Sequence, residues 1–154
     1  MRHLKPIITC SIILSLLLVI AACDLPVSYS SEVLTGLANG EPWTFASGSI
    51  DRNGYVKMYA EEVIFGDVFT ALPSDVIFFT INPLEEGEVR LQLDPSGLNT
   101  SKAVTMYIDG VNHICTRGGY EVLIITDTEI SGRMRAEADN ENFINGTFTL
   151  TRIQ

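Results

Sequence analysis

The stretch Glu129–Asp139, EISGRMRAEAD, alternates strictly between two kinds of residue. The even positions are apolar or small, and the odd positions carry polar or charged side chains, namely Glu129, Ser131, Arg133, Arg135 and Glu137. A period of two is typical of a strand with one buried face and one wet face. The stretch therefore predicts a long strand, and its small residues leave room on the buried face for an aromatic neighbour.

The same period recurs along the chain on both sides of this stretch. Residues 143–153 continue it after a turn, and residues 120–126 (YEVLIIT) are apolar on both faces, which predicts a central, covered strand. Asp109-Gly110 is a two-residue signal for a type I′ hairpin. Further strands are predicted at residues 33–38, 43–50, 55–60, 75–82, 87–94, 103–108 and 111–116. The sequence thus predicts an all-β fold of about nine or ten antiparallel strands, either a sandwich or a partly closed barrel.

The chain begins with a short basic segment and an apolar run that ends at Ala22. The run is shorter than the ~20 apolar residues of a comfortable spanning helix, and it has the length and flanks of a secretory signal peptide. Two outcomes are open at the junction Ile20-Ala21-Ala22-Cys23. An ordinary signal peptidase would cut after Ala22 and leave Cys23 as a free thiol. Alternatively, the junction resembles the lipobox of bacterial lipoproteins.

The lipobox resemblance is the interpretation we favour. It implies that the Cys23 thiol takes a diacylglycerol, that cleavage falls between Ala22 and Cys23, and that the new amine is acylated with a fatty chain such as palmitate. The predicted organisation is then a signal-peptide helix at residues 1–22, a lipidated cysteine and flexible tether at 23–31, and a β-domain at 32–154. The mature protein would be exported and anchored in the cell envelope. Asp24 resembles an inner-membrane retention signal, but inner membrane, outer membrane and cell surface stay open.

Charge excludes some partners. Two of the ten Lys and Arg residues lie in the leader (Arg2 and Lys5), so eight cations face nineteen acids in residues 23–154 and the net charge is −11. Nucleic acids and anionic lipid surfaces both require clustered Lys and Arg. The composition therefore argues against nucleic acid as a partner and against an electrostatic grip on lipid.

The residues after Cys23 carry no pattern that predicts catalysis, a metal site or a cofactor. His113 is the only histidine there, and with Cys115 it makes two candidate ligands, too few for a metal site. No nucleophile has a base at a recognisable spacing, so we interpret the protein as not an enzyme. Cys115 is expected to be a buried thiol without a disulfide partner.

A candidate binding face consists of Arg133, Arg135 and Trp43. The two arginines share the wet face of one strand with Glu129 and Glu137, where they form either a solvated charge ladder or a stripe that binds an anion or a partner. Trp43 belongs to an aromatic patch for a sugar or peptide in one interpretation. Its alternation with Phe45 favours core packing instead.

Two stretches resemble the small β-rich lipoproteins of unassigned function found in Gram-negative bacteria. One runs from Leu34-Thr35-Gly36 to Trp43, and the other is the closing meander from Gly119-Tyr120 to Phe148. Such domains are lipocalin-like or sandwich-like, and the resemblance supplies no catalytic residues. The functional hypothesis is a lipid-anchored, non-catalytic domain that binds a protein or another envelope component. The alternative is a lipocalin-like carrier of a small apolar ligand inside a closed sheet.

Overall fold

The protein is described by a computed structural model over residues 26–65, 72–93 and 102–153, and these residues contain eleven strands and no helix. In chain order the strands are β1 (Thr35–Ala38), β2 (Glu41–Thr44), β3 (Ser47–Ile50), β4 (Tyr55–Tyr59), β5 (Val76–Thr80), β6 (Gly87–Arg90), β7 (Val104–Ile108), β8 (Val111–Cys115), β9 (Arg117–Ile125), β10 (Glu129–Glu137) and β11 (Phe143–Arg152). The predicted all-β fold is confirmed. The predicted signal-peptide helix lies outside the described residues.

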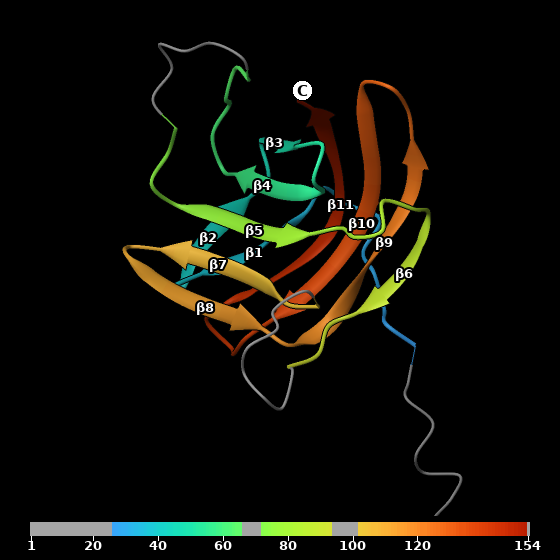
Figure 1. Cartoon of the computed structure of the whole chain (residues 1–154). Helices are drawn as coiled ribbons and strands as arrows, with labels where there is room; N and C mark the ends of the chain where they lie inside the picture. Colours follow the sequence, from blue (N-terminus) through green and yellow to red (C-terminus); the bar gives the residue numbers. More distant parts are fainter. Residues whose placement is uncertain (1–25, 66–71, 94–101, 154) are drawn as a thin grey trace, which may run out of the picture.

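All eleven strands belong to one sheet. Its order is β6-β9-β10-β11-β3-β4-β5-β7-β8, and β1 and β2 are attached beside the start of β11. The sheet curls into a half-barrel (Figure 1), so a partly closed barrel describes it better than a two-layer sandwich. Every strand pair is antiparallel except β11 with β3, which run parallel through Thr151 and Arg152. This parallel pair differs from the all-antiparallel prediction.

The predicted long strand is β10, an interior strand of the sheet. It pairs along its length with β11 on one side and with β9 on the other. Ile130, Met134 and Ala136 are fully buried on the concave side of the curl, which we call the inner face. A Cβ atom added to Gly132 would lie 2.7 Å from the ring of Phe148. The aromatic neighbour predicted from the small residues of β10 is therefore Phe148 of β11.

The predicted strand at residues 43–50 is in fact two strands, β2 and β3. β2 pairs with β1, whereas β3 pairs with β4 and β11. Between them the Phe45 N–H donates to the Leu34 carbonyl and the Ala46 N–H donates to the Tyr59 carbonyl, each at 2.9 Å. The backbone thus changes partners across two residues. Alternation of side chains carries no information on such a change.

The prediction that residues 120–126 form a covered strand is wrong for their second half. Tyr120 and Val122 are buried, but Leu123 and Ile124 are 44% and 55% exposed. The register between β9 and β10 shifts at Ser131/Gly132, and the pairing with β6 ends at Val122. A bulge inserts one unpaired residue and re-aims its neighbours. Leu123 and Ile124 consequently lie beyond the cover of β6.

The turns follow the predicted chemistry. Asp109 and Gly110 both have positive φ, 51° and 81°, and they join β7 to β8. Asn39 and Gly40 do the same between β1 and β2, with φ of 53° and 79°. Positive φ at both central residues defines the type I′ turn, whose twist matches that of the strands it joins.

The core fills the inner face of the half-barrel. Ile77, Met106, Ile144 and Leu150 are all fully buried there, although they come from three different strands. The rings of Phe79 and Tyr120 pack 5.0 Å apart between their centroids. A fully buried side chain of this size contributes about 1.5–3 kcal/mol to folding. The core leaves the outer face of β6, β9, β10 and β11 for the charged residues.

Candidate functional site

Ala22 and Cys23, the predicted cleavage and lipidation residues, lie outside the described residues. The lipid anchor therefore stays a prediction from the sequence.

Among residues 26–65, 72–93 and 102–153, no helix is long and apolar enough to cross a bilayer.

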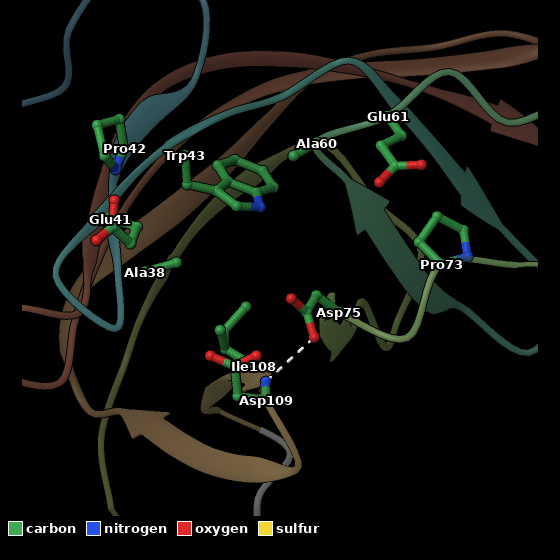
Figure 2. Close-up of a pocket in the computed structure, with 10 residues that line it drawn as sticks. All are labelled: Ala38, Glu41, Pro42, Trp43, Ala60, Glu61, Pro73, Asp75, Ile108 and Asp109. Atoms are coloured by element: carbon green, nitrogen blue, oxygen red, sulfur yellow. Dashed lines mark hydrogen bonds between the residues drawn. The ribbon is translucent and has the colours of Figure 1, made fainter.

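Trp43 is a core residue that also lines a cleft. It is 5% exposed and belongs to the hydrophobic core, as its alternation with Phe45 predicted. One side of its indole borders a cleft of about 270 Å³ between β2, the end of β4, the start of β5 and the β7–β8 turn (Figure 2). The indole N–H makes no hydrogen bond to the residues that the structure describes, and it is not fully buried. The N–H is thus a donor open to the cleft.

Carboxylates surround this Trp43 cleft. Its lining includes Glu41, Glu61, Asp75 and Asp109, together with small and apolar residues. The backbone N–H of Asp109 donates to Oδ1 of Asp75 at 3.1 Å (Figure 2), and the side-chain amide of Asn39 donates to Oδ2 of Asp109 at 3.2 Å. These bonds tie the β1–β2 turn and the start of β5 to the β7–β8 turn. The carboxylates are therefore presented by a connected rim.

Arg133 is held by its own molecule. Its Nε donates to the Glu121 carboxylate on the neighbouring strand, and its guanidinium lies 4.7 Å from the centre of the Tyr29 ring. The Tyr29 hydroxyl donates to Glu88 at 3.1 Å. Burial of Tyr29 and its bond to Glu88 raise the pKa of its hydroxyl. Arg133 is thus part of a charge and ring cluster that fixes the segment before β1.

That segment, residues 26–33, is named here the N-terminal strap. The Ser30 N–H donates to the side chain of Asn145 at 2.9 Å, and the Thr147 N–H donates to the Glu32 carbonyl at 2.8 Å. Val33 forms a parallel bridge with Thr147. Residues 26–31, interpreted from sequence as part of a flexible tether, therefore lie against the outer face of the sheet. The strap has no periodic pattern, so the sequence did not predict this contact.

Arg135 lies in a different place from Trp43. Its guanidinium is 3.9 Å from Glu137, which also pairs with Arg117 at 2.8 Å. These side chains line an open cleft on the outer face, bordered by the strap. The structure thus places Arg133 and Arg135 on one face but does not bring Trp43 to it. The Trp43 cleft and the outer face are two separate candidate sites.

His113 and Cys115 do not form a ligand cluster. His113 is half-buried on β8 and Cys115 is fully buried, which confirms the expected burial of this thiol. Within the described parts of the chain, no three His, Cys, Asp or Glu side chains gather in a way that could hold a metal ion.

The Cys115 thiol should be inert in the folded protein. Burial, with a smaller effect from the nearby Asp139 charge, raises its pKa from 9.0 to about 12. We expect almost no reaction with a thiolate-selective disulfide reagent at about pH 8, and full reaction after urea unfolding. Because the folded-state pKa is the higher one, the free energy of unfolding should fall as pH rises from 9 toward 12. The measurement uses residues 23–154 with Cys23→Ser, in which Cys115 is the only thiol. Rapid labelling of this folded variant would contradict the assignment.

The fold and the clefts define a single-sheet half-barrel with two surface sites of opposite charge. Comparison of the chain with protein-family models, with curated proteins and with solved structures finds no match in any of the three. The function must therefore be argued from the residues themselves.

Proposed function

We propose that the protein is a lipid-anchored, non-catalytic binding protein of the bacterial cell envelope, whose Trp43 cleft takes a basic side chain of an envelope protein. The anchor is the lipidated Cys23, and the mature protein begins there after cleavage behind Ala22. The observation that carries the binding part is the Trp43 cleft, whose lining combines an indole ring with four carboxylates.

The chemistry of the cleft supports a cationic ligand. Lys and Arg side chains combine an apolar stem with a charged head, and the lining offers Trp43, Pro42 and Ile108 to the stem. Asp75 is half-buried beside Asp109, so an ammonium or guanidinium group between them would be partly shielded from water. The volume of about 270 Å³ lies below the ~300–1,000 Å³ of typical small-molecule pockets. It suits one side chain.

The alternative, a carrier of a small apolar ligand, requires an apolar cavity inside the curl. The inner face of the half-barrel is occupied by packed side chains, among them Phe79, Met106 and Met134. The Tyr120 hydroxyl donates to the Thr80 carbonyl at 3.3 Å across this interior. These contacts favour the surface cleft over an interior cavity as the place where a ligand binds.

The fluorescence of Trp43 provides a direct test, because it is the only tryptophan of the chain. We expect a lysine-rich peptide to change this fluorescence on binding to residues 23–154, and a glutamate-rich peptide of the same length to leave it unchanged. Asp75→Asn keeps the acceptor for the Asp109 N–H but removes the charge, and it should weaken lysine-peptide binding about fivefold. The measurement is a fluorescence titration.

The matched control is Glu129→Gln on the exposed start of β10, which removes the same charge far from the cleft. It should leave the affinity unchanged. Equal loss in Asp75→Asn and Glu129→Gln would show that only the net charge of the protein matters. Equal binding of both peptides would show that the cleft does not select a cation, and it would overturn the proposal. In cells, crosslinking of the membrane fraction should capture an envelope protein through the native cleft and not through the Asp75→Asn variant.

A further inference from the structure

The outer face gathers arginines that are far apart in the sequence. The cleft bordered by the strap has a volume of about 570 Å³ and is lined by Arg90, Arg117 and Arg135, with Glu137 as its acidic residue. We call it the arginine cleft. Among the residues that the structure describes, the lining of this cleft thus holds three of the eight cations of residues 23–154 and one of the nineteen acids. In a region whose net charge is −11, this is a local reversal of sign.

Strand register places two of these arginines in one row. Arg90 of β6 pairs with Gly119 of β9, and Gly119 pairs with Arg135 of β10, so the three residues form one row on the outer face. Adjacent strands lie ~4.8 Å apart, so the two arginine backbones are about 10 Å apart. Gly119 has no side chain, and the strap covers it: a Cβ there would lie 2.9 Å from the Tyr29 hydroxyl and 3.3 Å from the Val27 side chain. The side chains of Arg117 and Arg135 remain 59% and 46% exposed beside the strap.

Arginine is the side chain best suited to a phosphate group. Its planar guanidinium presents five N–H donors in a fork that matches phosphate oxygens. Arg117 uses donors for Glu137 and for the Ala138 carbonyl, at 2.8 and 3.1 Å, but one carboxylate cannot neutralise two arginines. The cleft therefore retains positive charge and donors that an anionic ligand would satisfy.

The strap places this cleft close to the predicted anchor. Pro26, Val27 and Ser28 form one wall of the cleft, and the described chain runs beside β9 and β6 at this point (Figure 1). Two residues separate Cys23 from Pro26, and an extended chain spans at most about 11 Å over the three steps from one to the other. If Cys23 carries the lipid, the Pro26 wall of the cleft would lie close to the bilayer surface, at a distance similar to the Debye length of about 10 Å at 0.1 M salt.

We propose that the arginine cleft binds the phosphate of an anionic phospholipid in the membrane that holds the anchor. The acidic remainder of the domain is repelled by anionic lipid, so this cleft would set which side of the half-barrel faces the bilayer. The Trp43 cleft would then stay free for a partner. The placement near the bilayer depends on the proposed anchor, whereas the affinity for the phosphate does not.

The test uses residues 23–154 with Cys23→Ser, which contain the whole described fold and carry no lipid. Sedimentation should recover more protein with phosphatidylcholine vesicles that contain phosphatidylglycerol than with phosphatidylcholine alone, at an ionic strength of about 10 mM. The net negative charge of the protein alone predicts the opposite result, in which less protein sediments with the anionic vesicles. The double variant Arg117→Gln with Arg135→Gln should bind anionic vesicles about 25-fold more weakly, which corresponds to about fivefold per arginine.

Matched variants and competitors separate the outcomes. Arg52→Gln with Arg152→Gln removes two cations from the opposite end of the sheet and should leave vesicle binding within about twofold of the parent. Arg135→Lys keeps the charge and should retain most of the binding, and circular dichroism checks that each variant is folded. The proposal is overturned by absence of a preference for anionic vesicles, by equal losses in both double variants, or by binding of inorganic phosphate without vesicle binding. Because Cys23 is absent, failure here leaves the anchor proposal standing.

Discussion

Replacing Gly54 with alanine should lower the free energy of unfolding by about 2–5 kcal/mol. Gly54 has φ of +80° in the β3–β4 turn, a conformation that costs an L-residue about 1–2 kcal/mol. An added Cβ would also overlap the carbonyl oxygen of Ile81. That carbonyl cannot simply move away, because the Ile81 N–H donates to the Gly54 carbonyl at 2.9 Å. Overpacking of this kind adds about 1–3 kcal/mol.

Gly40→Ala is the matched control for this prediction. Gly40 has nearly the same φ, +79°, but a Cβ there meets nothing within 4 Å. Its substitution should therefore cost only the backbone term of about 1–2 kcal/mol. Urea unfolding followed by Trp43 fluorescence measures both losses. Equal losses would mean that the contact with Ile81 relaxes freely and that the β3–β4 turn is less rigid than its hydrogen bonds indicate.

The features of the fold that depend on neighbouring residues could be predicted from the sequence. The alternation around Met134 and the aromatic that fills the space at Gly132 were expected, and Asp109-Gly110 forms the predicted turn. In each case the cause lies within one strand, within one turn, or between two strands that are neighbours in the sequence. Period two and positive-φ residues are local properties, so local sequence predicts them.

The features that depend on distant pairing could not be predicted. The Phe45 and Ala46 N–H groups donate to two different segments, at Leu34 before β1 and at Tyr59 of β4, which splits the predicted strand into β2 and β3. The parallel pair of β11 with β3 brings the last strand beside the third at Arg152 and Ile50. No residue in either strand distinguishes a parallel from an antiparallel neighbour. Which strands become neighbours depends on how the whole sheet curls, and no single strand determines this.

The candidate sites show the same division. The sequence identified Arg133, Arg135 and Trp43, but it grouped them on one face, and the structure separates Trp43 from the arginines. Net charge could not predict the arginine cleft either. Arg90 and Arg135 are far apart in the sequence, and they come into one row only because β6 and β10 both pair with β9. Net charge describes the surface as a whole. The local sign of a surface depends on strand order.

Replacing Cys23 with serine should abolish lipid attachment completely. The thioether to a diacylglycerol requires a sulfur nucleophile, and a serine hydroxyl has a far higher pKa than a thiol. In the lipobox route that this junction resembles, cleavage follows acylation, so the variant should also keep its leader. Intact-mass spectrometry of the membrane fraction measures both effects: the parent should have the mass of residues 23–154 plus acyl chains, and the variant that of the unmodified full chain.

Cys10→Ser is the control for this experiment, since Cys10 lies in the predicted leader and leaves with it. Its product should have the same mass as the parent. A parent product with the bare mass of residues 23–154 would instead indicate an ordinary signal peptidase that cuts after Ala22, and the anchor proposal would be wrong. A single acyl chain holds a protein only marginally and reversibly on a membrane, whereas two or more hold it stably. The number of chains in the measured mass therefore decides whether the arginine cleft merely orients an anchored domain or must itself add to the attachment.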